Sequence, residues 1–291
     1  MLSVLIPTYN QVCLPLVCKL QTLLVRAAID YEIIVADDGS TDAATTEANS
    51  PINELPCCAY IIRSENVGRA AIRNFLAQTA RHSHLLFIDS DMTVIDDSFI
   101  ERYLEHLGES VVDGGISIGG APESLKGNLR YLYETAEAPR HTHEERQKSP
   151  YQHLHTANLL IPRTLMLQYP FDERFRHYGY EDVLLGKTFH QHHVPIKHID
   201  NPLGFCTFET NADFVAKTEE GLRTLHRFQE DLRGYSRLLT FVAGIHSPLV
   251  LWLIRLWHRL FHRAERHNLC SHRPSLLLFK IYRLGYYLTL K

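Results

Sequence analysis

The chain has 291 residues, of which 45% are hydrophobic and 22% charged, and its formal net charge at pH 7 is −3. This composition is ordinary for a globular protein and leaves room for one large or two small domains. The six cysteines follow no metal-ligand or disulfide spacing, which excludes a disulfide-stapled scaffold and fits a reducing cytosol.

The charges are distributed unevenly along the chain. Residues 232–291 contain ten Lys or Arg residues and a single acid, Glu265, whereas residues 1–231 contain 20 basic and 32 acidic residues. The body of the protein is therefore acidic and its tail basic.

The chain starts with "MLSVLIPTYN", an apolar run that reads as a strand from the first residue. No basic segment or long apolar segment precedes this run, so we expect no secretory signal and a cytoplasmic protein.

The first 120 residues alternate between strand and helix patterns. "SVLIPTY", "YEIIVADDGSTD", "CAYIIRS" and "HLLFIDSD" read as buried strands, and residues 12–28, 68–80 and 97–107 read as helices. Short connections between such elements indicate βαβ units, so the fold class is α/β with a mostly parallel sheet flanked by helices.

Polar clusters follow three of these strands. They are Thr8-Tyr9-Asn10, Asp37-Asp38-Gly39-Ser40 and Asp89-Ser90-Asp91. Ligands of parallel sheets bind beyond the carboxyl ends of the strands, so we expect all three clusters to line one crevice.

The pattern changes after residue 133. Residues 134–155 are polar and uneven, which predicts a mobile surface loop, and residues 207–234 read as a solvated helix.

Five elements, taken in order, resemble the family 2 glycosyltransferases of the GT-A fold. They are "VLIPTYN", "ADDGSTD", "NVGRAAIRN", "DSD" and "YGYEDVLLG", and they cover roughly residues 1 to 210. The resemblance implies transfer of a sugar from a nucleotide diphosphate donor to an acceptor, with inversion at the anomeric carbon. It predicts a Rossmann-like GT-A domain over residues 1–231, with a nucleotide-sugar-binding half over 1–120 and an acceptor half over 121–231.

The Asp-Ser-Asp motif points to a divalent cation. The leaving diphosphate gains negative charge, and Mn²⁺ or Mg²⁺ held by hard oxygen ligands can neutralise it. Residues two apart on an extended segment point the same way, so Asp89 and Asp91 can act together. By resemblance Asp91 binds the metal directly, Asp89 reaches the ribose or a metal-bound water, and Ser90 belongs to the donor site. The alternative is a simple turn after a strand.

The resemblance assigns the nucleoside to the first two clusters. Asp38 would accept the uracil N3–H and Tyr9 would pack on the base, with Pro7 and Thr8 lining the pocket. The alternative is a capping loop in which Asp37 and Ser40 satisfy backbone donors.

The motif "NVGRAAIRN" contributes a glycine and an arginine to the donor site. Gly68 permits close backbone approach or a positive φ. Arg73 lies on an otherwise apolar helix face and needs a partner, either a donor phosphate, Asp89 or a purely structural ion pair.

"YGYEDVLLG" supplies two neighbouring acids. An inverting transfer needs a carboxylate that takes the proton from the acceptor hydroxyl. By resemblance Asp182 is this base and Glu181 orients or binds the acceptor, with Asn158 and Tyr180 as further acceptor-binding residues. Acids at a helix N-terminus also favour the helix dipole, which is the alternative.

One position departs from the family pattern. Many relatives carry a His in a segment shaped like "DNPxxH", whereas Phe205 stands there in "HIDNPLGFCTFETN". His198, seven residues earlier, is the only nearby substitute that we consider as a third metal ligand.

Residues 232–291 are predicted to form a basic, amphipathic, helical C-terminal region. From residue 249 on, Leu249, Trp252, Leu253, Leu256, Leu260 and Phe261 fall on one side, and Arg255, His258, Arg259, His262 and Arg266 on the other. Two interpretations stay open: a helix lying on an anionic membrane surface, or a subdomain packed on the body or on a second subunit as a homodimer. No recognition motif accompanies the charge, so we expect no nucleic-acid partner.

The sequence thus predicts a metal-dependent inverting glycosyltransferase that acts in cell-surface polysaccharide synthesis. A UDP-sugar is the favoured donor, a glycan or lipid-linked molecule the acceptor, and the inner face of the plasma membrane a peripheral location. Two alternative functions are a degenerate nucleotide-sugar-binding subunit, which the presence of Phe205 in place of the expected His favours, and a sugar nucleotidyltransferase. The second needs a glycine-rich phosphate loop after the first strand, and "PTYNQV" has none.

Overall fold

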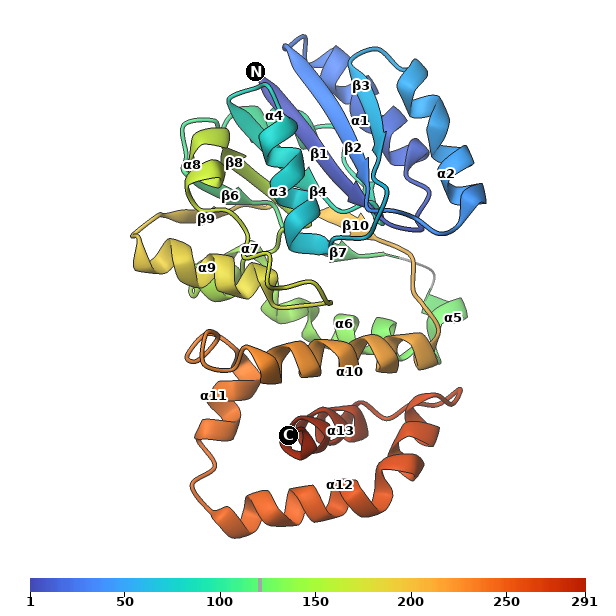
Figure 1. Cartoon of the computed structure of the whole chain (residues 1–291), viewed down its shortest axis with the longest axis vertical. Coiled ribbons are helices and arrows are strands. Elements are labelled where there is room, and N and C mark those ends of the chain that lie inside the picture. Colours follow the sequence, from blue (N-terminus) through green and yellow to red (C-terminus); the bar gives the residue numbers. More distant parts are fainter. Residues whose placement is uncertain (120–121) are drawn as a thin grey trace.

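The computed structural model describes residues 1–119 and 122–291, so the predicted boundary between the two halves at 120/121 lies outside the described residues. A seven-stranded sheet in the order β3-β2-β1-β4-β8-β6-β9 forms the centre (Figure 1). Only β8 runs against its neighbours in this sheet. The strands are β1 (Leu2–Thr8), β2 (Tyr31–Asp37), β3 (Cys58–Ile62), β4 (His84–Ile88), β6 (Val111–Asp113), β8 (Asn158–Pro162) and β9 (Ile196–His198). The expected mostly parallel α/β sheet is confirmed.

Helices cover both faces of the sheet. Alternate residues of β1 enter two cores: Leu2, Val4 and Ile6 pack against one face's helices, and Leu5 against the other's. Strands buried on both faces explain why their sequences are continuously apolar. The first face carries α1 (Leu14–Arg26) and α4 (Phe99–Leu104), and the second α3 (Arg69–Thr79), α8 (Arg163–Gln168) and α9 (Glu181–Gln191).

A small second sheet lies beside the carboxyl end of β4. It has the order β5-β10-β7, with β5 (Met92–Val94), β10 (Leu203–Phe205) and β7 (Ile116–Ile118). β10 pairs antiparallel with β5, and Phe205 lies opposite Met92. This pairing brings residue 205 next to the Asp-Ser-Asp motif, although more than a hundred residues separate them.

The segment 134–155 differs from the predicted loop. It contains the end of α6 (Leu129–Glu137), two 3₁₀ turns, η2 (Ala138–Arg140) and η3 (Pro150–Gln152), and α7 (His143–Gln147). Thr142 caps α7 and Arg146 is buried within the body. A buried arginine with a carboxylate partner orders this polar segment, and sequence periodicity does not reveal such a pair. The remaining short helices are α2 (Ala43–Asn49), η1 (Ser50–Glu54) and α5 (Pro122–Leu125).

The C-terminal region packs on the body. It consists of α11 (Arg237–Ala243), α12 (Pro248–Leu269) and α13 (Leu276–Thr289), and α13 lies between α10 (Asn211–Arg227) and α12 (Figure 1). Phe214 and Val215 of α10, Leu269 of α12 and Phe279 of α13 share one apolar cluster. Thus α10 is not the solvated helix we expected, because one of its faces is covered by the tail.

In the described part of the chain, no helix is both long enough and apolar enough to cross a membrane.

Candidate active site

One cleft collects the predicted donor-binding residues. It has a volume of about 540 Å³ and opens at the carboxyl ends of β1, β2 and β4. The nine predicted residues that line it are Pro7, Thr8, Tyr9, Asp38, Gly68, Arg73, Asp89, Ser90 and Asp91. The parallel strands bring together residues up to 84 positions apart because their carboxyl ends meet at one edge of the sheet.

Side-chain hydrogen bonds hold the loops of this cleft in place. The Asn10 Oδ1 atom accepts bonds from the backbone N–H groups of Thr41 (2.9 Å) and Asp42 (3.0 Å), which ties the first two loops together. Asp38 accepts bonds from the N–H groups of Val67 and Gly68, both at 3.0 Å. The capping alternative is confirmed for the residues it named, since the Asp37 Oδ1 atom accepts a bond from the Ser40 N–H and the Ser40 Oγ atom accepts one from the Asn10 N–H, both at 2.7 Å. Tyr9 keeps 45% of its surface exposed at the rim.

Arg73 is a buried clamp between two acids. Its Nη2 donates to Asp89 Oδ1 at 2.7 Å and its Nη1 to Glu181 Oε1 at 3.1 Å, with only 2% of the arginine side chain exposed. Burial alone would raise the pKa of Asp89, but the charges of Arg73 and Arg69 hold it below its ordinary value. Of the partners considered for Arg73, the structure shows Asp89 and adds Glu181.

Asp91 has different surroundings from Asp89. Burial raises the pKa of Asp91, and the neighbouring Asp89 carboxylate raises it further. Within the described residues, no group of three His, Cys, Asp or Glu side chains is arranged to hold a metal ion. Mg²⁺ sites commonly use one or two carboxylates and complete the shell with substrate phosphates and water. The Asp89–Asp91 pair fits a divalent cation of that kind, and a cation would relieve the repulsion between the two carboxylates.

Neither Phe205 nor His198 offers a third ligand. Phe205 is buried in β10, and the Arg130 guanidinium lies over its ring at 4.1 Å. His198 is also buried, with its Nε2 3.0 Å from the Pro150 carbonyl oxygen and its Nδ1 2.8 Å from Arg146 Nη1. His198 therefore belongs to a separate polar network, and the idea that it replaces the missing ligand is wrong.

Two cations that the sequence interpretation overlooked also line the cleft. Arg69 and Lys217 both contact the ring of Tyr178, at 4.9 Å and 4.8 Å from its centroid. Arg69 directly follows Gly68 in the quoted motif and so had a local signal. Lys217 comes from α10, and only the tertiary structure brings it here.

The acids of α9 line a second cavity that adjoins the cleft. This cavity has a volume of about 290 Å³ and includes Tyr180, Glu181, Asp182 and, from the C-terminal helix α13, Arg283. Arg69 and Tyr178 border both spaces. Tyr180 precedes α9 in a left-handed conformation, with φ 72°. Such a conformation is uncommon for a residue other than glycine and is a local sign of constraint.

Asp182 is the acid of this cavity with an unusual pKa. Burial raises the pKa of Asp182 to about 6, and the Glu181 carboxylate contributes to the rise. Its Oδ1 accepts a bond from the Val183 N–H at 2.7 Å. Asp182 is thus ionised at neutral pH yet basic enough to accept a proton.

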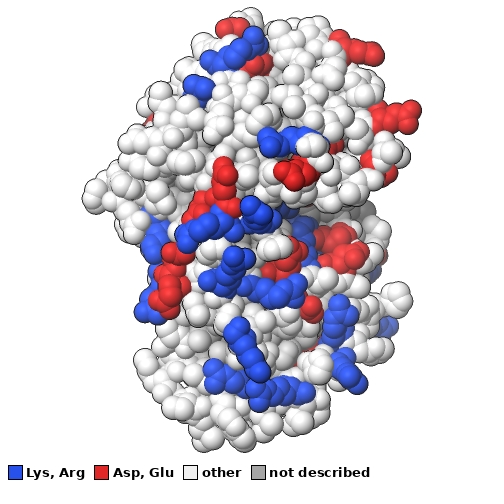
Figure 2. Space-filling view, in the orientation of Figure 1, with Lys and Arg blue, Asp and Glu red and all other residues white. Residues whose placement is uncertain are grey.

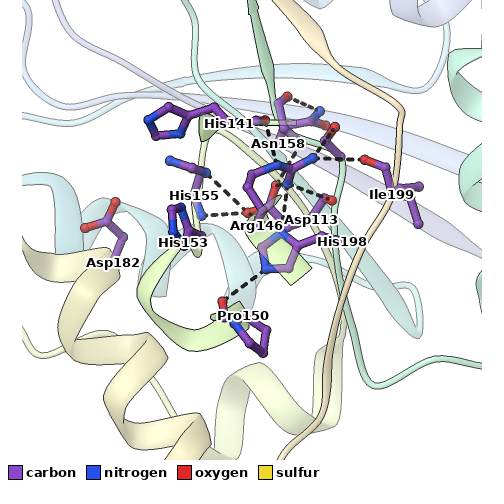
Figure 3. A network of polar contacts seen from close by, with 12 residues as sticks. Asp113, His141, Arg146, Pro150, His153, His155, Asn158, Asp182, His198 and Ile199 are labelled. Carbon is purple, nitrogen blue, oxygen red and sulfur yellow. Dashed lines mark hydrogen bonds and ion pairs between the residues drawn. The ribbon is translucent and has the colours of Figure 1, made fainter. Parts of the chain in front are cut away.

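A buried network around Asp113 lies beside Asp182 (Figure 3). Asp113 is fully buried and pairs with Arg146 at 2.7 Å and with His155 at 3.4 Å. Burial would lower the pKa of His155, but the Asp113 carboxylate beside its ring raises it overall. The charge of His155 in turn lowers the pKa of Asp182.

His153 differs from its neighbour His155. Burial and then the charge of Arg237 lower the pKa of His153 to about 4, so this ring is neutral at pH 7. The two histidines lie close together in Figure 3, but their pKa values are shifted in opposite directions.

Asn158 has a structural role. It is fully buried, and its amide Nδ2 donates to the carbonyl oxygens of Gly115 and Asn201, both at 2.8 Å. Its Oδ1 accepts a bond from the Tyr103 hydroxyl at 2.7 Å. These bonds use both amide protons of a fully buried side chain, so we correct the expectation that Asn158 binds the acceptor.

The largest of these spaces has a volume of about 710 Å³ and lies beside the small sheet. Arg130, Glu134, His141, His155 and Phe205 are among its lining residues, and Glu134 also borders the Asp182 cavity. The cavity that contains Asp182 therefore adjoins both the cleft and the 710 Å³ space.

Comparisons with solved structures support the fold. Mannosyltransferase PcManGT from Pyrobaculum calidifontis, in complex with GDP-Man and Mn²⁺, aligns with a TM-score of 0.53 at 12% identity, covering 99% of this chain and 84% of that one. S. aureus TarS 1-349 aligns with a TM-score of 0.50 at 16% identity, covering 98% and 89%. The fold is thus of the GT-A type.

Comparisons at the sequence level support the family. The validoxylamine A glucosyltransferase of Streptomyces hygroscopicus subsp. jinggangensis is 29% identical over 225 residues, covering 67% of this chain and 53% of that protein. The chondroitin synthase of Escherichia coli is 30% identical over 126 residues, covering 41% and 17%. The chain spans about half or less of the length of these two relatives. Residues 3–164 match the model of glycosyl transferase family 2, and the chain belongs to this family.

Proposed function

We propose that this protein is an inverting glycosyltransferase that moves a sugar from a nucleotide diphosphate sugar to a glycan or lipid-linked acceptor. The observation that supports the proposal most is that the predicted donor cleft and the cavity of Asp182 adjoin each other. The cleft with the nine predicted donor residues adjoins the cavity that contains Asp182, and Arg69 and Tyr178 border both. A role in cell-surface polysaccharide synthesis and a UDP-sugar donor are parts of the same proposal.

The donor end of the cleft suits a nucleotide. Tyr9 offers an exposed ring for stacking on a base, and Asp38 lies at the same end. Arg69 and Lys217 supply positive charge for the diphosphate. When bound, Mn²⁺ or Mg²⁺ held by Asp91 and Asp89 would neutralise charge on the leaving diphosphate.

The two acids of α9 divide the chemistry. Glu181 is buried and bonded to Arg73, so it orients the site and is not free to accept a proton. Asp182 faces the adjoining cavity and accepts the proton of the acceptor hydroxyl as the hydroxyl oxygen attacks the anomeric carbon. Attack from this side, opposite the leaving diphosphate, inverts the anomeric configuration.

Binding of the donor can be tested by thermal shift with UDP, GDP, dTDP and CDP, each with and without Mn²⁺. A ligand that binds only the folded protein raises its melting temperature. We expect one nucleotide to give a shift that depends on Mn²⁺, and Asp91→Ala to abolish the metal-dependent part. GDP is included because the mannosyltransferase of similar fold was solved with GDP-Man.

The second candidate is a degenerate binding subunit, and Phe205 at the expected His position favours it. This candidate predicts a nucleotide shift without any turnover of the donor. If the unchanged protein hydrolysed the sugar nucleotide and Asp182→Asn did not, the result would argue against a degenerate binding subunit. If none of the four nucleotides raised the melting temperature, both candidate functions would be contradicted.

A further inference from the structure

Helix α12 exposes much of its apolar surface, although Leu251, Ile254 and Leu269 pack inward. Its buried side carries a polar pair, in which His258 Nδ1 lies 2.8 Å from Glu265 Oε2 and only 6% and 2% of the two residues are exposed. The α13 backbone packs closely here, since a Cβ atom at Gly285 would lie 2.7 Å from His258 Cβ. We had expected His258 on a solvated polar face, and that expectation is wrong.

The outward side of α12 is apolar. Leu260 is 66% exposed, Leu249 63% and Trp252 54%. We call these residues, with the others exposed on the same helix, the α12 apolar face; its members are Leu249, Val250, Trp252, Leu253, Trp257, Leu260 and Phe261. A contiguous exposed face of this kind, which includes two tryptophans, marks an interaction surface.

The charges beside this face have a single sign. The exposed charged residues of α12 are Arg255, Arg259, Arg263 and Arg266, whose spacing of three or four residues forms a stripe along the helix. Within this stripe, Arg266 pairs with Glu219 of α10 at 3.4 Å and Arg255 Nε donates to the Leu288 carbonyl oxygen at 3.0 Å, so Arg259 and Arg263 contribute most of its available charge. Glu265, the only acid of the tail, is buried and bonded to His258 and to Trp257 Nε1. In Figure 2 blue side chains gather at the α12 end of the molecule, and its outermost rim is white.

We propose that the α12 apolar face docks on an anionic lipid bilayer, with its leucines and tryptophans in the interface and the arginine stripe at the level of the lipid phosphates. An apolar face flanked by arginines has the pattern of a helix that lies in the membrane plane. A second copy of the chain suits the surface less well, because a symmetric pair of these faces would bring two arginine stripes together.

The position of α12 links docking to the active site. α12 packs on α13, and α13 supplies Phe279 and Arg283 to the cavity that contains Asp182. A docked protein therefore holds this cavity one helix away from the lipid surface. This step rests on the proposed function and deepens it, because it makes the acceptor a lipid-linked one.

The docking is tested by co-sedimentation of the full chain with phosphatidylcholine vesicles, with and without phosphatidylserine, at low and high salt. We expect binding to the anionic vesicles that weakens with salt. Leu253→Glu/Leu260→Glu should reduce partitioning at least about tenfold, because it removes apolar contact and adds charge that the lipid repels. Both leucines are exposed, so the double variant should keep its melting temperature.

A matched control places the same charges outside the face. Val25 on α1 and Leu167 on α8 are 60% and 39% exposed, and Val25→Glu/Leu167→Glu should bind vesicles like the unchanged protein. Failure of the unchanged protein to bind anionic vesicles, or equal binding by both double variants, would overturn the proposal. So would a dimer in sedimentation velocity that Leu253→Glu/Leu260→Glu dissociates.

Vesicle binding is scored without nucleotide, and the thermal shift with nucleotide is scored without lipid. If the protein failed to bind vesicles but still gave a thermal shift with nucleotide, only the membrane docking would be contradicted. The reverse result would contradict the glycosyltransferase proposal and leave the docking surface standing.

Discussion

At the scale of single residues, the two neighbouring acids Glu181 and Asp182 have different surroundings and therefore different chemistry. Glu181 forms an ion pair with the buried Arg73, whereas Asp182 borders a cavity and has a pKa raised by burial to about 6. A carboxylate with a raised pKa is a stronger base and remains ionised at pH 7. This difference underlies two predictions.

The first prediction concerns Asp182→Asn. We expect nucleotide binding to change little and turnover to fall by about two orders of magnitude or more, the usual size of a general-base effect. Calorimetric titration with the nucleotide and a donor-turnover assay measure the two quantities separately. Equal loss of binding and turnover would mean that Asp182 supports the structure of the cleft instead.

The second prediction concerns pH. The rate should rise as pH increases through about 6, the pKa of Asp182, because the base works only when ionised. The positive charge of His155 lowers the pKa of Asp182, so His155→Gln should move this rise to higher pH. A profile of kcat/KM against pH measures the shift.

His153→Gln is the control for the pH experiment. Its pKa of about 4 makes the His153 ring neutral where Asp182 titrates, so this substitution should leave the midpoint of the profile unchanged. An identical shift in both variants would show that packing, and not the charge of His155, sets the profile.

At the scale of elements, the start of α3 holds the donor cleft together. Gly68 caps this helix with a φ of 91°, and its N–H donates to Asp38. A Cβ atom here would lie 2.6 Å from the Arg176 carbonyl oxygen, so the backbone of the loop between α8 and α9 would have to move. Gly68 thus permits both the turn before α3 and the close approach of the Arg176 backbone.

The third prediction compares two glycines. Gly68→Ala combines backbone strain with a clash, and we expect it to lower the free energy of unfolding by about 2–4 kcal/mol and to weaken nucleotide binding. Gly234 also has a positive φ, 81°, but open space around it. Gly234→Ala should therefore lose only about 1 kcal/mol. Denaturant unfolding measures both, and equal losses would refute the clash.

At the scale of the whole molecule, the basic tail is part of the folded body. α13 fills the groove between α10 and α12 and buries Phe279, Tyr282, Tyr287 and Leu288. The boundary at residue 231 divides an acidic part of the chain from a basic part, but residues on both sides of it share one apolar cluster. The tail completes both the apolar cluster of α10 and the cavity of Asp182.

The fourth prediction concerns removal of residues 232–291. The truncated chain would expose Phe214 and Val215, so we expect a lower melting temperature and aggregation. Leu253→Glu/Leu260→Glu, which leaves α13 in place, is the comparison and should melt like the full chain. A truncated protein with unchanged melting temperature would show that the tail is a separate unit.

The sequence by itself determined the α/β class and the polar clusters that line one cleft. Both follow from local patterns: apolar runs buried on both faces make strands, and polar residues at strand ends meet at one sheet edge. The role of Glu181 was only partly readable, because its partner Arg73 lies 108 positions away.

Only the tertiary structure decided where lone polar residues go. Asn158 and His198 resemble site residues in the sequence, but each is buried with its hydrogen bonds taken up inside the protein. Lys217 gave no local signal and lies in the cleft because α10 passes there. The direction of α12 was decided the same way: the buried His258–Glu265 pair faces α13, which turns the leucines and tryptophans outward. Periodicity shows that a helix has two faces, but which face is covered depends on the partner that packs against it.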